Sequence, residues 1–337
     1  MNLSIIRKLV QVSFFLFLVY GSAIVGYYIV EKVSGALPSL ACAYDFEGAD
    51  YCVLVPLQHQ VDHRIGGVIV SGANILKSLI PLMITLLTFI VMFIFLNKAF
   101  CGWVCPLGTF QEFVNMLGRK LGVRQRESLP DSVVDRVRPV KWVILVMLVF
   151  ALPLMAGLGM ASHDLGDPFC KICPSRILTT LAVGDTRQVY VDSSSNATLV
   201  LSLTADFLFG LMIALALTVR QPFCRICPML AMHAVFRKLG FARLVKEGAR
   251  PRCKKCGLCV KACPMDIREV QTEMEKRDVT FDDCTLCGRC VEFCPDKGVL
   301  KLKYTVFPIF SADPAYFKRR KKAQIQWEKK HLGNRSS

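Results

Sequence analysis

Charged and histidine side chains are scarce in this sequence. Of its 337 residues only 20% are charged and only five are histidine, whereas 53% are hydrophobic. A chain this apolar is not intrinsically disordered, because disordered chains contain few hydrophobic residues. The sequence also contains no Cys-x-x-Cys-His motif, which attaches a c-type haem, so we do not expect covalently bound haem.

The charge that is present is unequal in sign and unevenly distributed. The sequence has 42 basic and 26 acidic residues, for a net charge of +16. Soluble domains seldom combine such a positive charge with a mean hydropathy of +0.43. Long uncharged runs alternate with basic stretches, and this segregation indicates a membrane protein rather than one soluble globule.

Four apolar segments approach or reach the length of about 20 residues that a helix needs to cross a hydrocarbon core. Basic residues concentrate between the second and third segments and after the fourth, so the positive-inside rule places both termini in the cytoplasm. We therefore expect an all-α membrane domain (residues 1–240) of four transmembrane helices arranged as two hairpins. The segments span approximately residues 9–30, 78–96, 142–160 and 198–219.

The strongest motif is a cysteine run that occurs twice after residue 250. Each run reads Cys-x2-Cys-x2-Cys-x3-Cys-Pro, first over Cys253–Pro264 and then over Cys284–Pro295. This is the spacing of bacterial two-cluster ferredoxins, in which the fourth cysteine of each run ligates the other [4Fe–4S] cluster. The expected ligand sets are Cys253, Cys256, Cys259 and Cys294 for cluster 1, and Cys284, Cys287, Cys290 and Cys263 for cluster 2.

These runs predict an α+β two-cluster ferredoxin-like domain over residues 241–308. Zinc sites favour two spaced pairs instead, and structural disulfides are rare in the cytosol. A basic tail over residues 309–337 follows, with the cluster Lys318–Lys322. Beside a membrane such a cluster binds anionic lipids. No nucleic acid partner is expected, because the sequence shows no nucleic-acid-binding fold.

The other eight cysteines fall into two sets of four when they are sorted by the predicted topology. Four thiolates are the ligand complement of one [4Fe–4S] cluster. We therefore predict a third cluster at the inner face of the membrane and a fourth at the outer face. The inner set is Cys101, Cys105, Cys224 and Cys227, and the outer set is Cys42, Cys52, Cys170 and Cys173.

Each of these two sets has an alternative interpretation. Inside, a redox-active thiol pair competes with a cluster. Outside, oxidising conditions make Cys42–Cys52 and Cys170–Cys173 candidate disulfides. Against the disulfides, the outer Phe169–Pro174 and the inner Phe223–Pro228 both read Phe-Cys-x-Ile-Cys-Pro. Because the two motifs are so similar, we expect their cysteines to have the same role, as cluster ligands.

Asp206 lies inside the fourth apolar segment, nearer its outer end. An ionisable side chain at that depth is a functional candidate, because it is costly unless paired or hydrated. A quinol releases two protons with its two electrons, and a carboxylate near the outer face could accept one of them. The alternative is a residue that reaches interfacial water or pairs with a partner subunit.

The membrane cysteine motifs carry a family resemblance. Cys101–Glu112 reads CGWVCPLGTFQE, and with the later Phe223–Pro228 motif and the two ferredoxin runs it resembles the NapH-type membrane ferredoxins. These share motifs with the NosR and CcoG-type ferredoxin proteins. The resemblance implies a four-helix, multi-pass protein of the bacterial inner membrane, with a cytoplasmic ferredoxin domain, that takes part in quinol oxidation. The sequence departs from the pattern in its later Cys-x2-Cys pair and in Cys42 and Cys52.

We therefore expect an integral-membrane iron–sulfur electron-transfer subunit that passes electrons between the quinol pool and a periplasmic reductase. Its expected cofactors are the clusters above and a quinone. Its expected partners are other subunits of a membrane redox complex, including a ferredoxin-like or cytochrome protein. Two alternatives are a metal-reducing assembly factor like the CcoG group and a cluster-bearing scaffold subunit. Whether the chain is itself an enzyme is left open.

Overall fold

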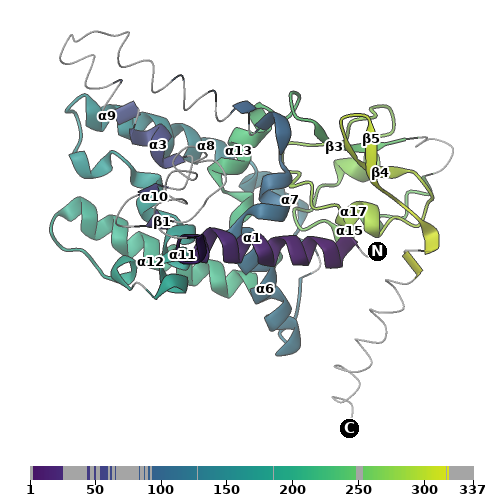
Figure 1. Cartoon of the computed structure of the whole chain (residues 1–337), viewed down its shortest axis with the longest axis horizontal. Coiled ribbons are helices and arrows are strands. Elements are labelled where there is room, and N and C mark those ends of the chain that lie inside the picture. The colour runs from purple at the N-terminus through teal and green to yellow at the C-terminus, as the bar shows by residue number, and fades with distance from the viewer. Residues whose placement is uncertain are drawn as a thin grey trace.

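The computed structural model of the chain is a helical bundle with a small sheet domain at one end (Figure 1). Cys42, Cys52, most of the expected span 78–96 and the basic tail beyond residue 318 lie outside the residues that it describes. The described residues are 3–25, 44–45, 49–50, 54–59, 61–62, 65, 83, 87, 90–91, 93–126, 128–184, 186–247, 253–315 and 317–318.

The bundle consists of helices and short connecting turns. A pair of two-residue strands, β1 and β2, is a departure from the all-α expectation; they pair antiparallel where the sequence has no helical periodicity. The elements in chain order are α1 (Leu3–Val25), β1 (Tyr44–Asp45), β2 (Ala49–Asp50), α3 (Leu54–His59), the π-helical η3 (Phe100–Val104), α6 (Pro106–Lys120), α7 (Asp131–Val137), α8 (Val140–Ile144), the π-helical η4 (Leu145–Ala151), α9 (Leu152–Gly157), η5 (His163–Leu165), α10 (Pro168–Ile172), α11 (Pro174–Val183), η6 (Arg187–Val189), α12 (Asn196–Ala216), η7 (Phe223–Arg225) and α13 (Pro228–Val235).

Two helical stretches within the described residues are long and apolar enough to cross a membrane. They are Asp131–Gly157, which comprises α7 to α9, and Asn196–Ala216, which is α12. They correspond to the third and fourth expected segments, although the first of them begins before the expected residue 142. Pro153 is accommodated because the helix widens into the π-helical turns of η4 just before it. Ser195 and Thr198 form a capping box that starts α12.

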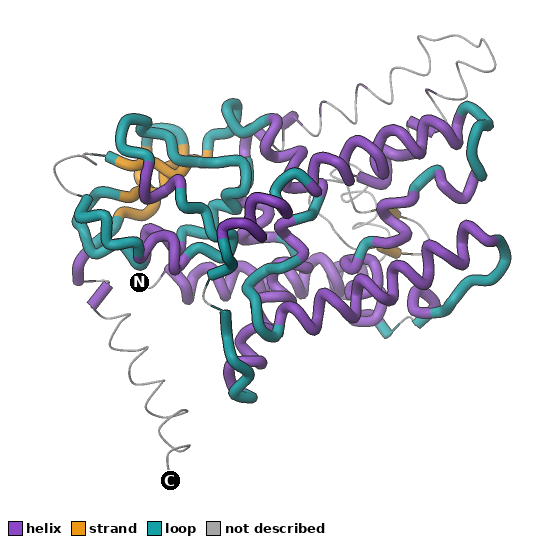
Figure 2. Tube along the Cα trace, turned by 180° about the vertical axis from the view of Figure 1, so that it is seen from behind, coloured by secondary structure: helices purple, strands orange, loops and turns teal. Residues whose placement is uncertain are grey.

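The segment between these two long helices, which contains α10 and α11, packs against the other helices of the bundle. In Figure 2 the chain turns back between them, and α10 packs against both α12 and η4. α11 then contacts α6, α12 and α1. The sequence predicted a loop here, and the structure has two short helices that fold back along the bundle.

The C-terminal domain is built on a three-stranded antiparallel sheet in the order β3-β4-β5. Inward-facing Leu244, Leu300 and Leu302 alternate with half-exposed residues along β3 and β4 and pack in one apolar core with the cysteine loops. The last strand extends past the expected domain end at residue 308. The elements are β3 (Ala242–Lys246), α15 (Leu258–Ala262), α16 (Glu269–Thr272), α17 (Arg289–Glu292), β4 (Leu300–Tyr304) and β5 (Phe307–Ser311).

A buried ion triad joins the C-terminal domain to the bundle. Glu112 of α6 accepts hydrogen bonds from Arg7 of α1, at 2.5 Å, and from Arg289 of α17. Burial would raise the pKa of Glu112, but the two arginines hold it at about 2. The N-terminal end of α1 therefore lies beside the ferredoxin domain, where Ser4 also donates a hydrogen bond to Glu292 (Figure 1).

We predict that Glu112→Gln destabilises the junction of the two domains. Two largely buried arginines would lose their carboxylate, and breaking such a pair costs about 3–5 kcal/mol. The matched control is Glu247→Gln, because Glu247 pairs with Lys301 and Lys303 at the surface, where ion pairs contribute about 0–1 kcal/mol. Thermal unfolding of the purified variants in detergent should show a clear drop for the first and almost none for the second. Equal drops would contradict the role of the triad.

Candidate metal centres

The two ferredoxin runs fold into loops with the same backbone. In each run the residue before the second cysteine is left-handed, Lys255 at φ 53° and Leu286 at φ 49°. The glycine after that cysteine is left-handed as well, Gly257 at φ 74° and Gly288 at φ 73°. Two left-handed residues so close together curl the chain tightly, so the thiols of one run can surround a common space.

The fourth cysteine of each run lies with the other run, as the spacing predicts for a two-cluster ferredoxin. Cys263 lines one cavity together with Cys284, Cys287 and Cys290, and Cys259 of the first run borders the same cavity. Burial is the main cause that raises the pKa of Cys294 to about 11. The nearby charges of Cys259 and Cys256 contribute to the same shift, so these residues lie close to Cys294. The expected ligand sets are therefore brought together as groups of thiols.

The chemistry of these sets suits iron–sulfur clusters. The thiols of Cys263, Cys284, Cys287 and Cys290 line a cavity rather than a surface. Burial, and then the neighbouring Cys287, raise the pKa of Cys263 to about 12. Iron binding would displace these protons, because the thiolate is the ligand. A [4Fe–4S] cluster, when bound, supplies a one-electron redox couple.

A second cysteine-lined cavity lies inside the bundle, at the end nearer the ferredoxin domain. Its lining is almost wholly apolar, with Phe100, Phe169 and Phe223 between the thiols. The cysteines that line it are Cys101, Cys105, Cys173, Cys224 and Cys227. All four cysteines of the expected inner set therefore line one cavity. Cys173 lines the same cavity as a fifth cysteine.

Prolines position these thiols. Cys105 and Cys227 each precede a proline that starts a helix, Pro106 of α6 and Pro228 of α13. A residue before proline is held in an extended conformation, and ψ is 118° at Cys105 and 124° at Cys227. Each thiol is therefore fixed at a helix N-terminus, where the helix dipole favours negative charge.

A buried glutamine holds the later pair in place. Gln111 of α6 is completely buried, and its Nε2 donates to the Cys224 Sγ at 3.5 Å and to the Leu107 carbonyl at 3.2 Å. Its Oε1 accepts a hydrogen bond from the Phe223 N–H at 3.0 Å. The side chain therefore ties the Phe223–Pro228 motif to α6 and directs an N–H donor at the Cys224 sulfur. Sequence reasoning missed Gln111, although it lies within the quoted motif Cys101–Glu112.

The two cavities are neighbours. Thr285 lines both of them, and its buried Oγ1 has no hydrogen-bond partner in the described part of the protein. An unpartnered hydroxyl between two thiol-lined cavities suits donation to a cluster sulfur. Gly102 fits against the Thr285 carbonyl so closely that a β-carbon would lie 2.3 Å from that oxygen. The Trp103 Nε1 donates to the Leu286 carbonyl at 2.9 Å across the same contact.

A buried lysine adds positive charge beside Cys284. The Lys98 Nζ donates to the carbonyls of Phe281 and Asp282 at 2.6 and 2.7 Å. Burial lowers its pKa to about 8, while Cys284 counteracts the shift. A cation here would favour a thiolate at Cys284. The hydropathy pattern gave no signal for this role, because Lys98 looked like one of several basic residues at a membrane border.

The structure describes two of the four cysteines of the expected outer set. Cys170 is buried in the bundle core, and Cys173 lines the cavity of the inner set. Burial raises the pKa of Cys227, and the neighbouring Cys173 raises it further. Cys42 and Cys52 lie outside the described residues.

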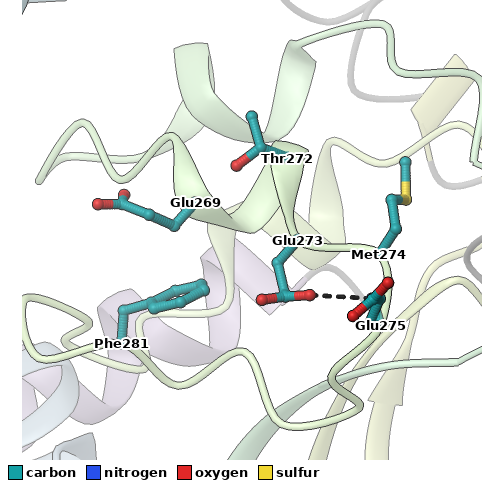
Figure 3. A pocket seen from close by; sticks show the side chains of 6 residues that line it. All are labelled: Glu269, Thr272, Glu273, Met274, Glu275 and Phe281. Atoms are coloured by element: carbon teal, nitrogen blue, oxygen red, sulfur yellow. Dashed lines mark hydrogen bonds between the residues drawn. The ribbon is translucent and has the colours of Figure 1, made fainter.

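Carboxylate side chains that do not line the cysteine cavities occur at two other positions in the structure. Asp206 is half-buried midway along α12 and is not among the residues that line the cysteine cavities. Figure 3 shows an open surface pocket beside α16 that is lined by Glu269, Glu273 and Glu275 with Thr272, Met274 and Phe281. Glu269 pairs there with Arg138, and Glu273 accepts the Glu275 N–H at 2.9 Å. These two carboxylates have structural partners, and no cysteine lines the pocket.

Comparison with protein families agrees with both cysteine regions. A family described as "4Fe-4S dicluster domain" matches residues 247–295. A second, described as "4Fe-4S binding domain", matches residues 79–124 and 203–246, which include the four cysteines of the inner set. Residues 125–202, with Cys170 and Cys173, lie outside both matches.

Several curated proteins are similar to this chain. NosR, a regulatory protein of Pseudomonas aeruginosa, is 31% identical over 54% of this chain and 22% of its own length. YccM, a putative electron transport protein of Escherichia coli, is 33% identical over 55% of this chain and 46% of its own length. NapH, a ferredoxin-type protein of Escherichia coli, is 26% identical over 50% of this chain and 48% of its own length. The resemblance to NapH- and NosR-type ferredoxin proteins is confirmed.

The matched region is less than half the length of each of these three relatives. No solved structure matches the chain. The matches support iron–sulfur binding regions in this chain, and its reaction is a separate question.

We predict that Gln111→Leu lowers the reduction potential of one cluster and leaves the others unchanged. A hydrogen bond to a ligand sulfur stabilises the more negative, reduced cluster, and hydrogen bonds of this kind set cluster potentials. Redox titration followed by electron paramagnetic resonance (EPR) would measure the shift. Gln125→Leu is the control, because the Gln125 side chain bonds Asn115 and the carbonyls of Val123 and Leu217 but no cysteine motif. An unshifted Gln111→Leu protein would contradict the assignment.

Proposed function

We propose that the protein is an integral-membrane iron–sulfur electron-transfer subunit that passes electrons between the quinol pool and partner redox subunits. The observation that carries the proposal is the contact between two cysteine-lined cavities through Thr285. One cavity belongs to the ferredoxin domain and the other to the core of the bundle. Electrons entering either site therefore have a short route to the other, without leaving the protein.

The surface of the bundle supports membrane integration. Exposed apolar side chains recur every three or four residues along α12, where Val200, Leu203 and Phe207 are 61%, 52% and 67% exposed. The same spacing recurs on α1 and on the described residues of the expected second span, whose exposed members are Ile5, Leu9, Val12, Leu16, Met83, Leu87, Val91 and Phe95. Apolar stripes of this extent are unusual on soluble monomers and fit contact with lipid. They support the four-helix arrangement.

The arrangement of the termini supports a common side for α1 and the ferredoxin domain. Arg7 of α1 pairs with Glu112 beside Arg289, so the start of the first span and the clusters lie at one end of the bundle. Basic residues gather at this end, and positive charge marks the cytoplasmic side. We infer that the ferredoxin domain is cytoplasmic and the far end of the bundle is periplasmic.

Quinol oxidation requires a proton acceptor as well as electron acceptors. One quinol yields one quinone, two electrons and two protons; the electrons leave singly to two clusters, and the protons leave to water or a base. Asp206 is the carboxylate that the chain offers inside a proposed span, and an ionisable group there is a candidate for this role. The partners that take or supply the electrons are other subunits of a respiratory complex.

The proposal is tested first by the metal content of the anaerobic full-length protein. Cys224→Ala should lower iron and acid-labile sulfide by about four atoms each per chain relative to the unmodified protein. The EPR signals of the ferredoxin clusters should persist and report that the fold is intact. Ile226→Val, between the two cysteines of the same motif, keeps both thiols and is the matched control. Unchanged iron in the Cys224→Ala protein would refute a bundle cluster.

We further predict that Asp206→Asn slows quinol-dependent reduction of the clusters by about tenfold or more, since removing a positioned base typically costs at least that. Asp164→Asn is the control, because Asp164 lies outside α12 and accepts a hydrogen bond from Ser195 at 2.8 Å. Stopped-flow reduction of oxidised protein by a soluble quinol measures both. Equal rates in the two variants would exclude Asp206 as the proton acceptor.

A further inference from the structure

The hairpin formed by β4 and β5 carries an exposed apolar segment (Figure 1). Val306, Phe307, Pro308 and Ile309 follow one another from the turn into β5, and all four are exposed. Val306 is 79% exposed, Phe307 76% and Ile309 58%. A run of exposed apolar residues marks a contact with something outside the chain, because on a free surface it would favour aggregation. We call these four residues the apolar tip.

The apolar tip follows a turn that is attached to the end of the expected second span, residues 78–96. The Phe241 N–H donates to the Ile94 carbonyl at 2.8 Å, and the Thr305 N–H donates to the Phe241 carbonyl at 2.8 Å. The Phe241 ring also lies 5.7 Å from the Phe95 ring and 5.9 Å from the Tyr304 ring, edge to face in both pairs. Phe241 therefore links the end of the span to the hairpin.

This link joins the tip to an apolar surface of the bundle. The described residues of the second span form a stripe of exposed apolar side chains, which under the proposed function faces lipid. Phe95 is the last member of the stripe and contacts Phe241, which is itself 36% exposed. The apolar tip therefore continues a lipid-facing surface onto the ferredoxin domain. The members of the stripe are Met83, Leu87, Val91 and Phe95.

The chain just before β3 has the composition of a segment that lies at a membrane interface. Val235 and Leu239 are 58% and 56% exposed, and Lys238 between them is exposed as well. The Asn97 Nδ2 donates to the Arg237 carbonyl at 3.4 Å, so this segment lies beside the same end of the second span. Apolar side chains interspersed with basic ones suit a surface where the former enter the interface and the latter meet anionic headgroups.

The edge of the sheet is better suited to lipid than to a further strand. β5 is an edge strand, since the order is β3-β4-β5, and an edge can in principle pair with another chain. Pro308 lies within β5, however, and the register between β4 and β5 shifts at Leu302 and Lys303. A proline and an irregular register both disfavour pairing with a further strand. This edge therefore offers apolar side chains rather than a regular row of backbone hydrogen-bonding groups.

We propose that the apolar tip inserts into the cytoplasmic interface of the membrane and, with the segment around Lys238, docks the ferredoxin domain on anionic lipid. The inference rests on the proposed function, because it requires that the bundle spans a membrane. It goes beyond that function by giving the ferredoxin domain a membrane contact of its own. The domain is then held by lipid at the hairpin and by protein at the buried triad of Glu112, so its clusters keep a fixed orientation to the membrane plane.

The test places a tryptophan at the tip and measures which quencher reaches it. Full-length Phe307→Trp protein is reconstituted into vesicles of equal phosphatidylcholine and phosphatidylglycerol, with or without bromine on the acyl chains. The emission added to that of the three native tryptophans is recorded. Brominated lipid should remove most of the added emission, and aqueous iodide should remove little. Added emission that iodide quenches and brominated lipid does not would overturn the inference.

The matched control lies at the opposite edge of the same sheet. Asp278 bridges Val245 of β3, so the neighbouring exposed Lys276 lies on the side away from β5. The emission added by Lys276→Trp should be quenched by iodide and not by brominated lipid. Quenching of both reporters by brominated lipid to the same extent would contradict a contact that is specific to the tip.

A third reporter separates failure of the inference from failure of the proposed function. Phe207 is 67% exposed on the apolar stripe of α12, so Phe207→Trp reports whether the bundle lies in lipid. Quenching by brominated lipid at residue 207 but not at residue 307 would overturn the inference alone. No such quenching at either residue would refute membrane integration and the proposed function with it. If neither quencher reaches residue 307, a protein surface covers the tip, which also overturns the inference.

A further comparison removes the preference of tryptophan itself for the interface. Val306→Trp is measured with and without Phe307→Asp, which places a charge in the apolar tip at an exposed position. The charge should reduce quenching by brominated lipid severalfold, whereas Lys276→Asp should leave it unchanged. Retained EPR signals of the ferredoxin clusters report that the domain is folded. Quenching that Phe307→Asp does not alter would contradict insertion of the tip.

The lipid charge is tested with the same Phe307→Trp protein. Vesicles of phosphatidylcholine alone should give weaker quenching by brominated chains than the mixed vesicles, because the basic segment loses its anionic partners. Lys238→Gln in the mixed vesicles should weaken the quenching in the same direction. Equal quenching in both kinds of vesicle would overturn the preference for anionic lipid.

Discussion

One backbone constraint recurs at the cysteines of this protein. Cys105, Cys173, Cys227 and Cys263 each stand directly before a proline, and ψ at these four positions lies between 118° and 126°. Proline excludes the helical conformation from the residue that precedes it, so the chain must bend at the thiol before a helix or turn begins. The backbone conformation of the cysteine, and with it the direction of its Cα–Cβ bond, is thereby fixed by the proline. The bundle cavity and the ferredoxin loops both depend on this local geometry.

The ferredoxin domain was largely predictable because its information is local. The spacing of each run determines which thiols can surround one space, and the crossing of Cys263 and Cys294 to the other run follows from it. The four cysteines of the inner set line one cavity, because the helices that carry them begin or end beside one another. For these residues, position in the sequence nearly determines position in space.

The location of Cys170 and Cys173 was not predictable in the same way. Hydropathy separates long apolar segments from polar connections, but it does not distinguish a connection that leaves the bundle from one that folds back into it. Gln58 and Gln111 were missed for a related reason: each bonds a cysteine motif more than a hundred residues away. A polar side chain whose partner is so distant resembles an ordinary loop or helix residue in the sequence.

Under the proposed function, the closeness of Gly102 to the Thr285 carbonyl affects the rate of electron transfer between the two parts of the protein. Electron tunnelling weakens steeply with the thickness of protein between donor and acceptor. At this point backbone meets backbone, and any side chain at residue 102 would have to push the two domains apart. Because glycine has no side chain, residue 102 allows the shortest possible distance between the bundle and the ferredoxin domain at this contact.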